Sequence, residues 1–222
     1  MASIVDICNL ALSELGNKAQ VVSIDPPDGS VEADLCRRFF AISRDEILEA
    51  GDWSFARTRA ALAELATNPS TVWDHAYALP SDCMVTRRII TEINEYKEDD
   101  SADFEVEGDT LFTDRANAIL IYTRPIEDPT KFSPGFVSAM AAQLGSYLAG
   151  PILRGESGTN AALTLRKLAA QKVNEAMSYD ANRRWSKGWF TPGFVAARGG
   201  NLPGSSPNSA DLIYPQSGYA IS

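Results

Sequence analysis

The sequence predicts an α+β protein, a helical bundle with an inserted antiparallel β-sheet and an extended C-terminal tail. Apolar residues recur at helical spacing in the first and last thirds of residues 1–185. β-Branched residues and alternating patterns fill the middle, and glycine, proline, serine and asparagine dominate from Ser186 onward. The expected parts are residues 1–66 for the first bundle helices, 67–130 for the sheet insertion, 131–185 for the last bundle helices and 186–222 for the tail.

The first expected helix starts at Ser3, which has the form of a capping box with Asp6 three residues later. An apolar stripe at helical spacing follows, and Gly16 can end the helix. The stripe comprises Ile4, Ile7, Cys8, Ala11, Leu12 and Leu15.

The second expected helix follows a turn-rich loop, is capped by Ser30 or Asp28, and runs to Gly51. Trp53 and Phe55 follow this helix and are spaced to anchor a chain that crosses from a helical layer into a sheet. Pro80 and Asp82 form a turn where a strand must stop. The buried ridge of the helix is expected at Val31, Leu35, Phe39, Ile42 and Leu48.

Strands are expected between residues 72 and 124. Residues 84–90 are rich in β-branched side chains, and residues 118–123 suit a central strand. Residues 104–107 and 110–113 alternate apolar with polar around Gly108-Asp109, which predicts a hairpin. The acidic run Glu98-Asp99-Asp100 is interpreted as a solvated loop rather than a carboxylate metal site.

Two further helices are expected. Ser133 caps the first, with Pro134 at the first helical position, and Gly150-Pro151 is expected to stop it. The second is expected from about residue 160 to 180. Their apolar positions are Phe136, Val137, Met140, Leu144 and Leu148 in the first, and Leu163, Leu168, Val173 and Met177 in the second.

Composition limits the function classes. The formal charge of −9 argues against a surface that grips nucleic acid, because phosphate binding needs clustered Lys and Arg. A lumen lined with carboxylates would instead repel the phosphate backbone and let DNA slide. No apolar run approaches the roughly 20 residues that cross a bilayer, and no secretory signal is expected. We expect a protein that is made and kept in a cytoplasm and spans no membrane.

Neither a metal centre nor a cofactor is expected. The chain has a single histidine, His75, and its cysteines Cys8, Cys36 and Cys83 are widely spaced without a Cys-x-x-Cys pair. Buried reduced thiols are the interpretation that fits this spacing.

Catalysis is not expected either. A thiol nucleophile would be Cys83 with His75 as its base, but no third group or oxyanion feature can be assigned to this pair. No glycine-rich loop with a lysine opens a helix, so nucleotide hydrolysis has no support. Glycoside hydrolysis by paired carboxylates stays open, because the separation of the two groups is a three-dimensional quantity.

The tail cannot form a core of its own, yet it carries many large apolar residues. Such a segment wraps over its own domain or binds a partner. The aromatic residues expected to bind the partner are Trp189, Phe190, Phe194, Tyr214 and Tyr219.

The order of the segments resembles the head-to-tail adaptors of tailed phages, the tail tubular protein A family of short-tailed phages. The residues that carry the resemblance run from Asp6 to Gly16, Trp53 to Arg57, Tyr77 to Cys83 and Phe132 to Phe136. The weight rests on their order and spacing over about the first 150 residues, and after Pro151 the match thins to a helix and a tail.

The resemblance implies a structural virion protein of the phage tail, assembled in the host cytoplasm. Family members form a ring, usually of about twelve copies, between the portal protein and the tail nozzle protein. DNA leaves through the ring without specific binding. Two alternatives remain from the residues alone. The first alternative is a small acidic cytoplasmic binding protein, and the second is a hydrolase.

Overall fold

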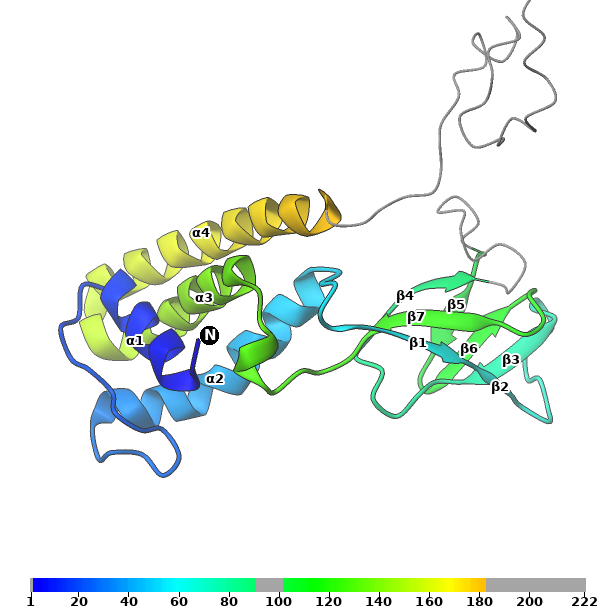
Figure 1. The fold of residues 1–222 in the computed structure, drawn as a ribbon, viewed down its shortest axis with the longest axis horizontal. Coiled ribbons are helices and arrows are strands. Elements are labelled where there is room, and N and C mark those ends of the chain that lie inside the picture. The colour runs from blue at the N-terminus through cyan, green and yellow to red at the C-terminus, as the bar shows by residue number, and fades with distance from the viewer. Residues whose placement is uncertain (1, 91–101, 183–222) are drawn as a thin grey trace, which may run out of the picture. The chain divides into compact units, whose positions relative to one another are not determined.

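The structure, a computed structural model, describes residues 2–90 and 102–182 (Figure 1). The helices are α1 Ile4–Glu14, α2 Val31–Ala50, α3 Pro134–Leu153 and α4 Gly155–Asn182, with the short 3₁₀ helix η2 Pro129–Lys131 before α3. The strands are β1 Arg57–Ala61, β2 Ala63–Glu64, β3 His75–Ala78, β4 Val85–Ile90, β5 Glu105–Glu107, β6 Thr110–Thr113 and β7 Ile119–Thr123. The protein is therefore α+β, which confirms the predicted class. The acidic run at 98–100 and the tail at 186–222 lie outside the described residues.

The strands form two antiparallel sheets between α2 and α3 in chain order. One sheet has the order β1-β7-β4, so β7 is its central strand, as predicted. The other has the order β2-β3-β6-β5 and contains the predicted hairpin. At that hairpin, Gly108 has a φ of +57°, a left-handed conformation that glycine adopts without steric cost.

The strands begin earlier than the expected boundary at residue 67. β1 starts at Arg57 and pairs with β7 from Arg57↔Thr123 to Ala61↔Ile119. Its sequence, Arg-Thr-Arg-Ala-Ala, has only one β-branched residue, so its strand state comes from pairing with β7 rather than from intrinsic preference.

Side-chain caps start three of the helices as predicted. Ser3 and Asp6 form the reciprocal capping box of α1. The Ser30 hydroxyl accepts from the Ala33 amide at the start of α2, and the Ser133 hydroxyl accepts from Phe136 at the start of α3. Of the predicted α1 stripe, Ile7, Cys8, Ala11 and Leu12 are fully buried and the outer two members are half-buried.

The predicted ridge of α2 is wrong at Val31 and Ile42, while Leu48 is buried as predicted. Val31 is 69% exposed and Ile42 is 47% exposed, while Leu35 and Phe39 are half-buried. The buried face consists of Ala33, Cys36, Phe40, Ser43, Ile47 and Leu48. Apolar residues occupy both faces of this helix, so helical spacing alone does not tell which face is buried.

Two expectations for the last helices are also wrong. α3 continues through Pro151 to Leu153, because a proline in the last turn removes only one hydrogen bond. α4 starts at Gly155 and buries Leu165, Ala169, Val173 and Ala176, while the predicted core residue Leu163 is 56% exposed. The close α3–α4 packing selects small residues: a Cβ on Gly135 would lie 2.6 Å from the Ala176 Cβ.

The largest core lies among the helices. α3 packs against α1, α2 and α4, and its Phe136, Met140, Leu144 and Leu148 have no exposed surface. By length and composition alone, α3 also passes as a candidate membrane span, within the described residues. Burial in this core accounts for its apolar composition, since a core helix passes the same test. A second core, with Tyr77, Leu111 and Leu120, lies among the strands.

Candidate functional site at the junction of helices and strands

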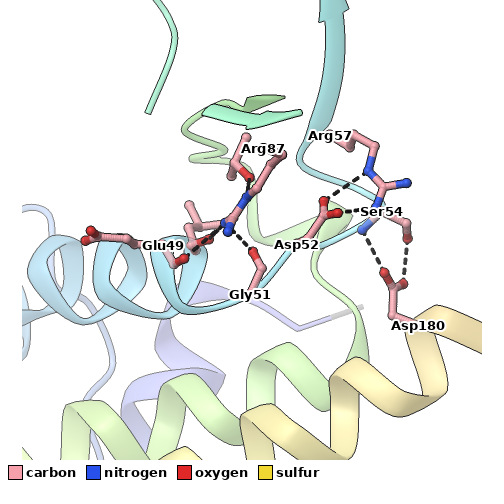
Figure 2. A network of polar contacts seen from close by, with 9 residues as sticks. Glu49, Gly51, Asp52, Ser54, Arg57, Arg87 and Asp180 are labelled. Atoms are coloured by element: carbon pink, nitrogen blue, oxygen red, sulfur yellow. Dashed lines mark hydrogen bonds and ion pairs between the residues drawn. The ribbon is translucent and has the colours of Figure 1, made fainter. Parts of the chain in front are cut away.

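Residues 51–57 connect α2 to β1, and polar contacts from three other elements converge on this short segment (Figure 2). The contacts come from β4, from β1 itself and from the last turn of α4. The segment is therefore the place where the helical core and the sheets are tied together.

Arg87 of β4 caps the C-terminal end of α2. Its Nη2 atom donates to the carbonyl oxygens of Leu48, Glu49 and Gly51 at 3.2, 3.0 and 2.7 Å, and its Nε donates to Thr123 Oγ1 at 2.8 Å. The last turn of α2 contains no basic residue of its own. A cation from the sheet thus satisfies the helix-end carbonyls and complements the negative end of the helix dipole.

A β-bulge positions Arg87. The register of β4 against β7 shifts between Thr86 and Arg88, so Arg87 is the extra residue. Such an insertion turns a side chain away from the regular alternation of the strand. Partial burial is the main effect on Arg87 and lowers its pKa, although a guanidinium stays protonated in proteins.

Two carboxylates hold the same segment in place. Asp52 binds Arg57 in a two-pronged contact, Nε to Oδ1 at 3.0 Å and Nη2 to Oδ2 at 2.6 Å. Asp180 of α4 accepts from the Ser54 amide at 2.9 Å and from the Ser54 hydroxyl at 2.6 Å. Asp180 is only 6% exposed, so this buried carboxylate holds the end of α4 against the linker.

The same segment contributes two side chains to an aromatic cluster in the helical core. Trp53 is fully buried, donates from Nε1 to the Ile47 carbonyl at 2.7 Å, and meets the Phe136 ring edge-on with centroids 5.1 Å apart. Phe55 and Phe132 complete the cluster. The predicted anchoring role of Trp53 and Phe55 is thus confirmed, with Phe55 half-buried rather than fully buried.

In the pair considered for catalysis, the His75 ring is paired with Glu64. His75 Nδ1 lies 2.8 Å from Glu64 Oε1, in a half-exposed pair on neighbouring strands. Burial raises the pKa of the Cys83 thiol, with a smaller contribution from Asp82. A nucleophilic thiol needs the opposite shift.

The other thiols lie where the sequence predicted. Cys8 and Cys36 are free and fully buried in the helical core. Within residues 2–90 and 102–182, no three His, Cys, Asp or Glu side chains converge as metal ligands would.

Two hollows lie near the end of α2. One, of about 700 Å³, is lined by Glu49, Pro80, Cys83 and Asp109 among others. The other, of about 290 Å³, lies between α2, α3 and α4 and includes Glu46 and Arg166 in its walls. Glu46 accepts hydrogen bonds from Gln143 and Tyr147, so its carboxylate is already engaged by α3.

Sequence reasoning placed the candidate site in the tail, and at the junction it found the aromatic anchors but missed the polar contacts. Trp189, Phe190, Phe194, Tyr214 and Tyr219 lie outside the described residues, so no position is assigned to them. Arg87 and Asp180 were not singled out, since no sequence pattern reports a bulge or a contact between residues 126 apart. Comparison with protein-family models and with curated proteins finds no match to this chain.

Proposed function

We propose that this chain is a structural virion protein, a head-to-tail adaptor that joins the portal of a phage capsid to its tail nozzle. In this role several copies form a ring, and each copy contributes a sector of the channel through which the genome leaves. The chain performs no chemistry, and its affinity for the portal comes from many repeated weak contacts acting together.

The observation that carries the proposal is the way the sheets interrupt the helical bundle. The strands enter the chain after Trp53 and leave it before Phe132, at two of the segments on which the family resemblance rests. Both segments then meet in one aromatic cluster, where the Phe55 and Phe132 ring centroids lie 5.8 Å apart. The segments that resemble the adaptors are therefore the structural joint of this fold.

The junction supports a mechanical role rather than a catalytic one. Arg87, Asp52 and Asp180 engage backbone or side-chain partners within the protein. A subunit that transmits force between portal and nozzle needs its parts tied in this way, whereas an active site needs groups that remain free for a substrate.

The charge supports a channel that does not retain DNA. The chain carries 29 Asp and Glu against 20 Lys and Arg. An excess of carboxylates repels phosphates, so DNA passes such a wall without a binding step.

The experiment mixes the full chain with the portal ring of the same phage and images the product by electron microscopy. The proposal expects an added layer of density on one end of the portal ring. A portal ring that stays bare at saturating chain concentration would contradict it.

A second arm tests the tail. Deleting residues from Ser186 onward is expected to leave a folded body that docks more weakly, because the aromatic side chains of that segment are lost. Circular dichroism confirms that the truncated body is folded. Undiminished docking of a folded truncation would show that the tail is not the portal-binding segment.

A further inference from the structure

The turn after β3 forms one wall of the larger hollow near the end of α2, whose volume is about 700 Å³. Residues 78–81 and 83–86 line this hollow, so its wall contains the turn at Pro80. The turn belongs to the segment from Tyr77 to Cys83, one of the four that carry the resemblance to the adaptors. Two of the other segments meet in the aromatic cluster, whereas this segment faces a hollow whose lining is in contact with solvent.

Backbone hydrogen bonds hold the walls of the larger hollow in place. The Cys83 amide donates to the Pro80 carbonyl oxygen at 2.9 Å, which closes the turn. The Leu79 amide donates to the Asp109 carbonyl oxygen at 2.9 Å, which ties the turn to the hairpin of β5 and β6. The hollow is therefore formed in the free protein, and a partner that fills it does not first have to order these walls.

The lining of the larger hollow combines apolar side chains with two carboxylates. The carboxylates belong to Glu49 in the last turn of α2 and to Asp109 in the hairpin, and both residues are exposed. No lysine or arginine is among the described residues that line the hollow. The larger apolar members are half-buried or exposed, and they are Leu79, Pro80, Met84, Val85 and Val106.

Neither carboxylate is neutralised by an ion pair within residues 2–90 and 102–182. Arg87 lies beside the end of α2, but its Nη2 donates to the backbone carbonyl oxygen of Glu49 at 3.0 Å. Figure 2 shows the Glu49 carboxylate pointing away from this guanidinium. A carboxylate in the last turn of a helix opposes the helix dipole, so the stability of α2 does not explain Glu49. The hollow thus presents two negative charges to a cation that enters it.

A protein segment fits this lining better than a small molecule does. Small-molecule sites enclose most of the ligand and are lined mainly by hydrophobic and aromatic side chains. The described lining residues here are half-buried or exposed, and none of them is aromatic. The volume of about 700 Å³ nevertheless lies within the usual range for binding sites, roughly 300 to 1,000 Å³. A short extended segment that lays a few side chains into the hollow meets both conditions.

We propose that the larger hollow binds an extended segment of the tail nozzle protein in which a lysine or arginine stands beside an apolar residue. The cation faces Glu49 and Asp109, and the apolar side chain covers Val106, which is 38% exposed. Charge complementarity selects such a segment, because both carboxylates would repel an acidic one. The inference rests on the adaptor function proposed above. There the C-terminal tail is assigned to the portal, and the hollow gives the nozzle a surface of its own.

A peptide probe tests the chemistry without the nozzle protein. The probe is a short fluorescein-labelled peptide of alternating leucine and lysine, titrated with the full chain and followed by fluorescence anisotropy. Binding is expected, and higher salt is expected to weaken it because the charges at the hollow are exposed. Peptides with glutamate in place of lysine, or with serine in place of leucine, are expected not to bind. A probe that does not bind the folded chain, or a lysine-serine peptide that binds as tightly, would overturn the proposal.

Matched charge variants show whether the probe binds at the hollow. Glu49→Gln together with Asp109→Asn is expected to weaken binding about tenfold, because both carboxylates that face the cation are lost. Glu127→Gln together with Glu156→Gln removes two charges at exposed residues that do not line the hollow, and is expected to leave binding unchanged. Equal losses in the two double variants would overturn the proposal, because the net charge of the chain would then control the affinity.

An apolar variant gives an independent readout. Val106→Thr keeps a branched side chain that suits a strand but makes the wall of the hollow polar, and is expected to weaken binding of the leucine-lysine peptide about threefold. Val72→Thr is the matched control, since Val72 is 80% exposed and does not line the hollow. Unchanged binding by a folded Val106→Thr variant would overturn the proposal, because the peptide would then leave this side chain uncovered.

Assembly with the portal and nozzle proteins of the same phage tests the source of the segment. The chain with Glu49→Gln and Asp109→Asn is expected to dock on the portal like the wild type and to bind the nozzle more weakly. Undiminished nozzle binding by this folded variant would overturn the proposal and leave the adaptor function intact. Loss of portal docking with normal nozzle binding would overturn it too, because the segment would then come from the portal. If the wild-type chain does not dock on the portal, the adaptor function fails instead, and the peptide titration still decides the chemistry of the hollow.

Discussion

The Nη2 atom of Arg87 lies 2.7 Å from the carbonyl oxygen of Gly51, a contact that joins β4 to the residue that ends α2. The same nitrogen reaches two further carbonyls of the helix end. One side chain thus connects the strands to the helical core, and its removal tests whether this joint holds the fold together.

Replacing Arg87 with Met is expected to lower the free energy of unfolding by about 1.5 to 3 kcal/mol, because hydrogen bonds to a charged group are lost and helix-end carbonyls are left without their donor. Chemical denaturation measures the change. Arg124→Met is the control, since it removes one cation from the exposed residue after β7. A loss of equal size in both variants would attribute the effect to charge rather than to the contact.

Gly51→Ala is expected to destabilise the protein by about 1 to 3 kcal/mol through overpacking. A Cβ there would lie 2.7 Å from Met177 Sδ and 2.8 Å from Trp53 Nε1. The matched variant is Gly150→Ala in α3, where nothing lies within 4 Å of the added Cβ. Alanine favours a helix, so this control is expected to be neutral or slightly stabilising. A neutral Gly51→Ala would mean that the side chains of Met177 and Trp53 move aside at little cost in free energy.

Trp53→Ala is expected to cost about 3 to 5 kcal/mol, the range for large aromatic residues removed from a core. Phe55→Ala is expected to cost less, because its side chain is only half-buried. Thermal or chemical unfolding of both variants gives the comparison. The reverse order would show that Phe55 contributes more than Trp53 to the stability of the aromatic cluster.

His75→Ala and Cys83→Ser are expected to leave portal docking intact. The His75–Glu64 pair is partly solvent-exposed, with side chains 27% and 55% exposed, and exposed pairs contribute about 0 to 1 kcal/mol. Docking is measured together with the melting temperature. If either variant kept its melting temperature and lost docking, a chemical role for this pair would have to be reconsidered.

The free chain is expected to show no measurable binding to duplex DNA at physiological salt. Non-specific affinity comes mainly from clustered cations that release counterions, and the pairs Arg37-Arg38, Arg87-Arg88 and Arg183-Arg184 are separated in a chain of net charge −9. Fluorescence anisotropy measures the binding. Micromolar, strongly salt-dependent affinity would favour a DNA-binding module over an adaptor.

The local features of the fold could be predicted from sequence because their causes are local. The caps at Ser3, Ser30 and Ser133 depend on neighbours three residues away, and β7 depends on its own apolar run. The hairpin around Gly108 likewise needs only a short turn.

The inner face of α2 and the polar contacts of the junction could not be predicted, since both depend on distant partners. Val31 and Ile42 fit a helical apolar ridge as well as the true core residues do, and only packing against α3 decides which stripe is buried. Arg87 acts through a bulge, and Asp180 reaches Ser54 across 126 residues. The prediction from sequence is wrong at the positions where tertiary contacts override the local pattern.

Native mass measurement of the full chain, alone and after mixing with the portal ring of the same phage, tests the adaptor function most directly. The account predicts one discrete complex whose mass exceeds that of the portal ring by a whole number of chains, with that number set by the symmetry of the ring. It also predicts that the ring of chains forms only when the portal is present, or that a larger fraction of the chains enters the ring when the portal is present. A mixture in which the folded chain keeps its free mass and the portal ring gains none would contradict the account.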